Sequence, residues 1–361
     1  MSYFTQFKEQ VDKGINKEQL WLPLKQGKLG DHIMFGKNMY FLFGGLPGSG
    51  KTAIVDTMFV LEPYRWWLKN RHKTNVKPFW IYRSMERSKV LKIAKWTAYM
   101  LFVDHGIMID VPTLMGWPNK LYELDEELIS LIDSYKEFFE QMEEHIIIID
   151  GAAHPTKIMD YAEKFAEKRG YFEQIDKFNR KYVQNDPNEI FIHVTDHVGK
   201  ITTQKDLNSD KQILDKHSQY MGALRDRYGY CIIDISQLNR EIENTYRAVK
   251  TELDIQPKDF KGSADLYENA DVVIGLMNPY KLNVFNYGDY QIEKFISKGK
   301  YNRFRGLKVI KNSYGVDDFS IGYQFLGENG AMIELPNAKE INYDLLRSGH
   351  YSKEYIKSAI Y

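Results

Sequence analysis

The chain has 361 residues, 43% of them hydrophobic, which is enough for one large domain or two average ones with a full core. Lys and Arg number 49, as do Asp and Glu, so the formal net charge is zero and any nucleic-acid surface must be local. The single cysteine, Cys231, lies in an apolar run, which excludes a disulfide framework and predicts a structural core thiol.

Residues 1–32 are predicted to form a leader. Tyr3, Phe4, Phe7 and Val11 recur at helical spacing, which favours a short amphipathic helix that packs on its own core or docks on a neighbouring subunit. The segment lacks the apolar centre of a signal peptide, and no run of the chain is long enough to span a membrane. We therefore expect a cytoplasmic protein without a membrane partner.

The run Gly44–Thr52, GGLPGSGKT, fits the phosphate-binding spacing G-x-x-x-x-G-K-S/T. It follows an apolar strand-like segment and precedes a helix expected from about Lys51, which is the order that this motif requires. Its glycines allow backbone N–H groups to point inward as an anion-binding nest at the positive end of the helix. ATP and Mg²⁺ are the predicted ligands, with Lys51 on the β- and γ-phosphates and the Thr52 hydroxyl on the metal. The predicted nucleotide-binding residues are Gly45, Pro47, Gly48, Ser49, Gly50, Lys51 and Thr52.

Strand-like and helix-like segments alternate from residue 38, which predicts an α/β fold with a mainly parallel sheet flanked by helices. One long helix is expected over residues 124–144, with apolar side chains on one side and mostly acidic ones elsewhere. After about residue 280, short β-like runs and turn signals predict antiparallel hairpins that close the sheet. The predicted organisation is a leader, one catalytic core over 33–336 and a helical tail over 337–361. The predicted strands are Tyr40–Phe43, Pro78–Tyr82, Ile146–Ile149, Ile190–Thr195, Cys231–Ile235 and Val272–Leu276, followed by the hairpin strands Leu307–Lys311, Phe319–Phe325 and Ala331–Leu335.

Polar side chains follow several of these strands. Hydrolysis of a triphosphate needs a second metal contact and a residue that orients the attacking water, and parallel sheets place such residues at the carboxyl ends of strands. The apolarity of the preceding strand favours Asp150 as the metal-binding (Walker B) aspartate, whereas chain order favours Asp196. His193 and His197 are four apart, but they fall on and just after a strand, so no zinc site is expected. The candidates at strand ends are Glu86, Asp150, Asp196 and Gln237.

Three short runs resemble motifs of the DnaB-like replicative hexameric helicases, and they occur in that family's order. Ser236–Arg240, SQLNR, resembles the run of that name, and Ser84–Glu86 resembles the family's SLEM element. Asp259–Ser263, followed by Asn269–Val273, resembles its DLRES and DADVV segments. The resemblance covers roughly residues 25–335 and implies a RecA-like P-loop ATPase core.

The resemblance also implies roles for individual residues. It implies that Glu86 is the base that activates water and that Asp196, with Thr52, binds Mg²⁺. It implies that Gln237 senses the γ-phosphate and couples it to loops that bind DNA. Between the two candidate metal-binding aspartates, it favours Asp196 over Asp150.

The chain departs from the family's pattern at one place. The family carries K-x-R-x-G after its last parallel strand, and the lysine and arginine reach into the neighbouring subunit's site. Here Lys311 matches the lysine, but Ser313 occupies the arginine position. An arginine finger can contribute several kcal/mol to phosphoryl transfer. Three alternatives stay open: Lys311 acts alone, Arg303 or Arg305 substitutes from the adjoining turn, or the ATPase is weak.

Two loops are the predicted nucleic-acid contacts, because in RecA-like cores the loops after the Walker B and SQ strands face the central channel. Both loops are polar and moderately basic, as a groove that follows a nucleic-acid backbone requires, although acids dilute their charge. A third stretch, 294–311, has seven basic residues and no acid, and we favour a subunit interface there over a phosphate-binding surface. The predicted contacts are Lys200, Lys205 and Lys211 in the loop 199–211, and Lys250, Lys258 and Lys261 in the loop 241–262.

The resemblance therefore implies an ATP-dependent replicative DNA helicase core. Such a core would form a homo-oligomeric ring, expected to be a hexamer, that hydrolyses ATP between subunits and translocates on single-stranded DNA, with a primase or loader as a further partner. Only about 30 residues precede the core, so the family's N-terminal domain is expected to be absent, which would suit a phage-like replication system. The alternatives are a RecA-like recombinase that does not unwind processively and a KaiC-like regulatory ATPase that needs no DNA.

Overall fold

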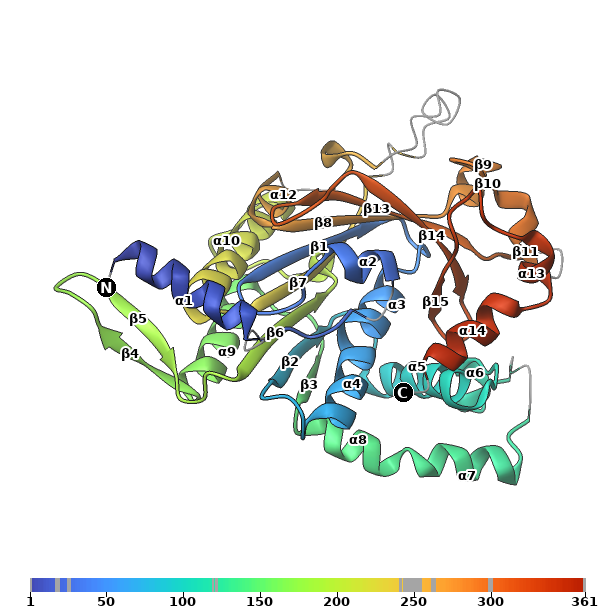
Figure 1. Ribbon diagram of the computed structural model, residues 1–361, viewed down its shortest axis with the longest axis horizontal. Helices are drawn as coiled ribbons and strands as arrows, with labels where there is room; N and C mark the ends of the chain where they lie inside the picture. Colours follow the sequence, from blue (N-terminus) through green and yellow to red (C-terminus); the bar gives the residue numbers. More distant parts are fainter. Residues whose placement is uncertain are drawn as a thin grey trace.

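A nine-stranded sheet forms the centre of the computed structural model, and helices cover both of its faces (Figure 1). The strand order is β15-β14-β13-β8-β1-β7-β6-β2-β3. The structure describes residues 2–16, 20–24, 27–118, 120, 123–239, 242, 255–260, 264–297 and 301–359.

The parallel part of the sheet confirms the predicted α/β fold. Each predicted strand is present and is extended by one to three residues, and neighbouring strands from β8 across to β3 all pair in parallel. Their apolar runs have nearly every side chain buried, because helices cover both faces. These strands are β1 (Met39–Gly45), β2 (Lys77–Ser84), β3 (Ile146–Asp150), β6 (Glu189–Asp196), β7 (Cys231–Gln237) and β8 (Val272–Met277).

The predicted antiparallel closure is confirmed as well. Strand β13 (Phe304–Asn312) pairs antiparallel with β8 and with β14 (Phe319–Leu326), which pairs with β15 (Ala331–Glu334). Three short two-stranded ribbons lie outside this sheet. They are β4 (Gly170–Gln174) with β5 (Arg180–Gln184), β9 (Asn286–Tyr287) with β10 (Tyr290–Gln291), and β11 (Ile296–Ser297) with β12 (Tyr301–Asn302).

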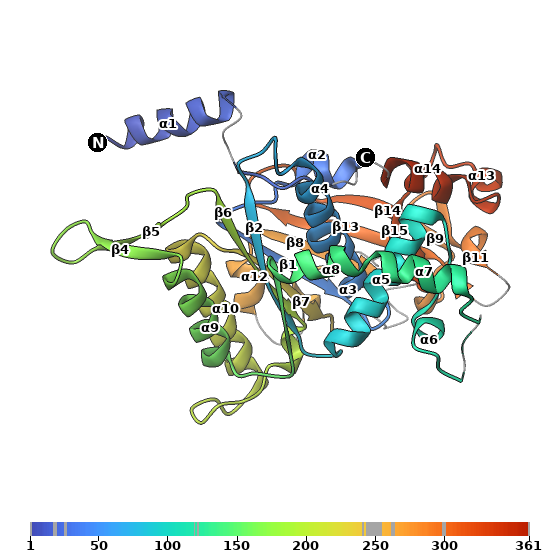
Figure 2. The same ribbon diagram turned by 90° about the horizontal axis from the view of Figure 1, so that it is seen from below.

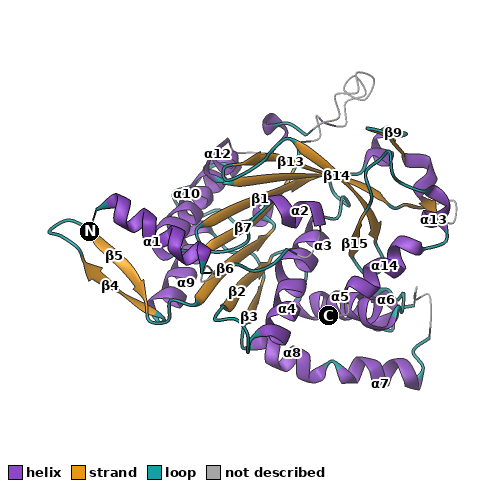
Figure 3. Cartoon of the chain, in the orientation of Figure 1, coloured by secondary structure: helices purple, strands orange, loops and turns teal. Residues whose placement is uncertain are grey.

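Two apolar layers hold the helices against the sheet (Figure 3). On one face, side chains such as Phe41 and Tyr82 pack with the helix that follows the glycine-rich loop and with α5 (Lys89–His105). On the other face, Tyr40 and Ile232 pack with α9 (Pro155–Glu167), α10 (Asp210–Tyr228) and α12 (Ala264–Asn269). The first-face helices also include α3 (Lys51–Val55), the π-helical turn Asp56–Leu61, α4 (Glu62–Asn70), α6 (Val111–Leu114), α7 (Glu126–Ser134), α8 (Lys136–Glu143) and α14 (His350–Ala359).

The single helix expected over 124–144 is wrong in one respect. The chain breaks at Tyr135 into α7 and α8. The Tyr135 ring is buried in the first-face core, and its hydroxyl donates to Asp104 at 3.0 Å. Turning this side chain inward ends α7 with a tighter turn, in which the Tyr135 N–H donates to the Ile132 carbonyl at 3.1 Å.

The leader holds two different kinds of structure. Helix α1 (Tyr3–Ile15) has no buried residue, and it stands clear of the body of the molecule (Figure 2). By contrast, Leu22 and Leu24 belong to the first-face core, as does Leu29 of α2 (Gly27–His32). The tail forms α13 (Tyr343–Arg347) and α14, and the Tyr355 hydroxyl contacts that of Tyr99 in α5 at 2.7 Å.

The ribbon β4–β5 was not expected from the sequence. It projects from the end of the molecule next to α9 (Figures 1 and 2), and its tip exposes Phe178 and Ile175. Its base is fixed by Tyr182, whose hydroxyl donates to the Ala166 carbonyl at 2.6 Å. The remaining short helical turns are Val198–Lys200, Pro257–Asp259, Pro279–Leu282 and Ile292–Phe295. Within the described part of the chain, no helix combines the length and the apolarity needed to cross a bilayer.

Candidate active site

The glycine-rich loop joins β1 to α3 and has the backbone that its glycines permit. Gly48 and Gly50 have φ angles of +75° and +97°, in the left-handed region that favours glycine. A Cβ at Gly45 would lie 2.4 Å from the Ser49 hydroxyl oxygen and 2.8 Å from the Leu276 carbonyl. The Ser49 hydroxyl is buried, and no hydrogen-bond partner for it occurs among the described residues. The loop is therefore a tight cradle with an unused polar group, as a phosphate site needs.

Lys51 is folded into this cradle. Its Nζ donates to the Gly45 carbonyl at 2.6 Å and to the Leu46 carbonyl at 3.1 Å. Burial lowers the pKa of Lys51 to about 8, although the nearby carboxylates of Glu86 and Asp196 act in the opposite direction. A lysine that is largely desolvated and held by two carbonyl dipoles can turn to an arriving phosphate without a long search.

Nucleotide affinity is expected to fall as the pH rises above about 8. Below that pH the Lys51 ammonium is charged with or without ligand, whereas above it the free protein must take up a proton to bind a phosphate. The affinity then falls by up to roughly tenfold per pH unit. The measurement is the affinity of a fluorescent ATP analogue in EDTA, between about pH 7 and about pH 10.

Lys51→Arg is the matched control for this pH dependence, because its cation does not titrate in that range. The variant should show a flatter curve. An equally steep fall in Lys51→Arg would assign the effect to another group. Lys95 lines the same pocket, and burial also lowers its pKa to about 8.

The sheet brings Asp196, and not Asp150, to the glycine-rich loop. The Thr52 hydroxyl donates to Asp196 Oδ1 at 2.9 Å. Asp150 ends β3 at the edge of the sheet, beyond β2, and its Oδ2 accepts the backbone N–H of Lys89 at 3.0 Å, at the start of α5. A hydroxyl and a carboxylate side by side below the phosphate cradle are the hard oxygen ligands that Mg²⁺ prefers. These residues fit the metal that the loop implies.

We expect Asp196→Asn and Asp150→Asn to differ sharply. Asp196→Asn should lower Mg²⁺-dependent ATP turnover by roughly 100-fold or more, because it removes a charge that holds the metal. Asp150→Asn should stay within about twofold, since asparagine can still accept the Lys89 N–H at the helix start. Steady-state ATPase assays with Mg²⁺ titrated at fixed ATP compare the two, and a loss confined to Asp150→Asn would reverse the assignment.

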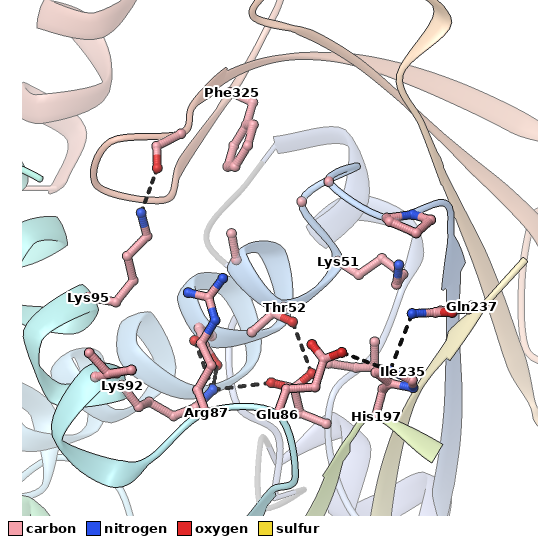
Figure 4. Close-up of a pocket in the computed structure, with 18 residues that line it drawn as sticks. Lys51, Thr52, Glu86, Arg87, Lys92, Lys95, His197, Ile235, Gln237 and Phe325 are labelled. Atoms are coloured by element: carbon pink, nitrogen blue, oxygen red, sulfur yellow. Dashed lines mark hydrogen bonds and ion pairs between the residues drawn. The ribbon is translucent and has the colours of Figure 1, made fainter. Parts of the chain in front are cut away.

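Glu86, His197 and Gln237 form a polar group on the other side of Lys51 (Figure 4). His197 Nδ1 accepts the Gly199 N–H at 3.0 Å, so the neutral ring carries its hydrogen on Nε2. That Nε2 lies 2.9 Å from Glu86 Oε1 and 3.4 Å from Gln237 Nε2. Burial lowers the pKa of His197, which favours this neutral ring. His197 thus orients the Glu86 carboxylate, which points into the pocket.

The sequence analysis considered His197 only as a zinc ligand and did not assign it to this site. The available signal was its position directly after Asp196 at a strand end. The pocket that these residues line has a volume of about 260 Å³. It brings together the glycine-rich loop, Glu86, Asp196 and Gln237 from four separate strand ends.

A second hollow, of about 730 Å³, adjoins this pocket and shares Phe325 with it. The Arg305 guanidinium lies over the Phe325 ring, 4.9 Å from its centroid, and its NH2 is 3.5 Å from the Gly48 carbonyl. Arg303 pairs instead with Glu328 at 2.6 Å. Both arginines therefore contact groups of their own chain, and their action on a neighbouring subunit stays a prediction.

Lys311 lies far from its own chain's loop. It pairs with Val273 near the start of β8, whereas the loop follows the end of β1, next to Leu276 near the end of β8. Its Nζ donates to the carbonyls of Glu268 at 3.0 Å and Tyr267 at 3.4 Å, at the end of α12. A catalytic role for Lys311 would therefore need a second subunit, and it stays a prediction.

The predicted nucleic-acid lysines are partly described. Lys200, Lys205 and Lys211 are exposed, and Lys211 pairs with Asp215 at 2.7 Å. Lys258 is also exposed. Lys250 and Lys261 lie outside the described residues, as does most of 241–262. Contact of these lysines with nucleic acid stays a prediction.

Comparison with solved structures identifies the fold. The isolated ATPase domain of a helicase superposes with a TM-score of 0.64 at 16% sequence identity, covering 93% of this chain and all of that domain. A DnaB-like replicative helicase, solved in a study of its interactions with primase, superposes at 0.63 with 15% identity, covering 93% of this chain and 67% of the other. The chain has the fold of DnaB-type helicase ATPase domains. A KaiC-like protein from Pyrococcus horikoshii superposes at 0.46 with 12% identity, covering 88% of this chain and 98% of the other. No protein-family model and no curated protein matches the sequence.

Proposed function

We propose that this protein is a helicase-type ATPase that hydrolyses ATP with Mg²⁺ and translocates on single-stranded DNA. One observation carries the proposal. The Thr52 hydroxyl contacts Asp196 at 2.9 Å in the same pocket that holds Lys51 and Glu86, so metal ligands, phosphate cradle and base candidate converge. The fold shared with helicase ATPase domains supports the same function.

Each residue has a defined task in this proposal. Lys51 and the N-terminus of α3 bind the phosphates, and Thr52 and Asp196 hold Mg²⁺, which supplies charge neutralisation at the transferred phosphoryl group. Glu86 accepts the proton of the attacking water, as a carboxylate held by His197 at 2.9 Å can do. Gln237, which touches the same histidine, is placed to transmit the state of the phosphates to the loop that follows β7.

We propose that the chain works as a ring of identical subunits. Helix α1 has 13 residues, and Tyr3, Phe4 and Phe7 are exposed on it. A helix of that length is marginal by itself in water, so a neighbouring subunit is the proposed docking surface. The distance of Lys311 from its own chain's loop supports the same arrangement, in which it reaches a neighbour's nucleotide. The hexameric number of subunits and a primase or loader partner are parts of this proposal that only solution experiments can test.

The deciding experiment is strand separation on a forked duplex with a 5′ tail, with Lys51→Ala as the blank. ATP-dependent separation that requires Lys51 would support the helicase. ATPase activity that single strands stimulate without separation would favour a recombinase-like protein. ATPase activity indifferent to DNA would favour a regulatory ATPase and contradict the proposal.

A further inference from the structure

A buried lysine lies directly behind the aspartate that we assign to Mg²⁺. Lys92, in the first turns of α5, has a side chain that is 1% exposed. Its Nζ lies 3.4 Å from Asp196 Oδ2 and 3.1 and 3.2 Å from the two carboxylate oxygens of Asp56. The Tyr82 hydroxyl accepts from the same Nζ at 2.7 Å. The sequence analysis assigned none of these three partners, Lys92, Asp56 and Tyr82, to the site.

The four side chains come from four different elements. Asp56 belongs to the helix that follows the glycine-rich loop, Tyr82 to β2, Lys92 to α5 and Asp196 to β6. Tyr82 adds contacts between the carboxylates, because its hydroxyl lies 2.7 Å from Asp56 Oδ1 and 3.2 Å from Asp196 Oδ2. The cluster therefore ties together the segments that carry the phosphate cradle, Glu86 and the metal ligand.

The two oxygens of Asp196 have separate partners. Oδ1 accepts from Thr52, on the side of the phosphate cradle, and Oδ2 faces Tyr82 and Lys92. Two buried carboxylates so close together would repel each other, and one of them would gain a proton unless a cation compensates. Lys92 is the compensating cation, and its contact with Oδ2 leaves Oδ1 turned toward the site of the metal.

We propose that Lys92 is a positioning residue for the metal-binding carboxylate of Asp196. It does not touch nucleotide or metal; it holds Asp196 in one orientation and in its anionic form. The inference rests on the proposed function only through the assignment of Mg²⁺ to Thr52 and Asp196. It does not depend on whether the protein unwinds DNA.

Two simpler explanations make different predictions. If Lys92 only neutralised Asp56, removing both charges together would leave the metal site unchanged. If Lys92 acted only as a distant positive charge, removing it would strengthen Mg²⁺ binding, because a nearby cation repels a metal ion. A positioning role predicts weaker Mg²⁺ binding in both cases.

The test uses Lys92→Met and the double variant Lys92→Met with Asp56→Asn. The double variant replaces the buried pair by neutral side chains of similar size, a change that proteins often tolerate. A fluorescent non-hydrolysable ATP analogue reports binding while Mg²⁺ is titrated, so the readout does not require turnover. We expect the half-saturating Mg²⁺ concentration to rise by roughly tenfold or more in both variants, while the affinity in EDTA stays unchanged.

Arg65→Met is the matched control, because it removes a largely buried cation that pairs with Asp104 outside the pocket. It should lower the thermal midpoint without moving the Mg²⁺ titration. If Lys92→Met does not fold, the double variant alone decides. Wild-type Mg²⁺ dependence in the double variant, or tighter Mg²⁺ binding in Lys92→Met, would overturn the inference and leave the proposed function intact. Nucleotide binding by the wild type that ignores Mg²⁺ would instead remove the metal assignment on which both depend.

Discussion

Lys51→Ala is expected to lower the rate of ATP hydrolysis by roughly 10²–10³-fold, which is the effect of removing one preorganised charge that stabilises a transition state. The Lys51 side chain is buried in the loop and already donates to two of its carbonyls. The alanine variant keeps the loop's glycines and their left-handed backbone, so the loss should come from the missing ammonium. Strand separation should disappear with turnover. The measurements are steady-state ATPase rates and the forked-duplex assay.

Circular dichroism and the thermal midpoint control for folding in this variant. Removing a desolvated lysine takes a strained charge out of a tight loop, so the stability of Lys51→Ala should match or exceed that of the wild type. Turnover within a few fold of the wild type in a folded variant would mean that the loop does not position a triphosphate. The proposed function would then be wrong at its first step.

Glu86→Gln is expected to lower kcat by roughly 10²–10⁴-fold while leaving ATP binding nearly unchanged. Glutamine keeps the length of the side chain and can still accept the hydrogen bond from His197 Nε2, now 2.9 Å from Glu86 Oε1. It cannot take a proton from water. The expected signature is therefore a protein that binds a fluorescent ATP analogue as the wild type does and hydrolyses almost none.

The control for this prediction is His197→Ala. It removes the group that orients Glu86 but leaves the base itself, so it should lose less activity than Glu86→Gln. Single-turnover rates at saturating ATP separate the chemical step from product release. Normal turnover in Glu86→Gln would exclude Glu86 as the base, and the water would need another acceptor in the pocket.

Much of the candidate site followed from local sequence. The glycine-rich loop depends on residues that are neighbours in the chain, and its φ angles at Gly48 and Gly50 are those that the spacing requires. Strand ends were also predictable, because an apolar run that stops at a polar residue marks the edge of a parallel sheet. Glu86 and Gln237 were found in this way and lie together in the pocket.

Other parts of the site depend on pairing between distant segments. Asp150 and Asp196 both follow apolar strands, and local pattern favoured Asp150. The order β7-β6-β2-β3 moves Asp150 to the sheet edge and puts Asp196 beside Thr52. His197 was misjudged because its partner Glu86 comes from a different strand. Lys92 and Asp56 were missed because a lysine in an amphipathic helix is usually exposed, and only tertiary packing buries this one.

The sequence by itself determined the class of fold, the phosphate-binding loop and the set of polar residues at strand ends. These features depend on short-range periodicity and on backbone freedom, which a single segment carries within itself. The tertiary structure decided which carboxylate meets Thr52, how His197 orients Glu86, where the helix over 124–144 breaks, and that Lys92 is buried behind Asp196. Those contacts join residues that are far apart in the chain, so they exist only after the sheet order and the packing of its two faces are set.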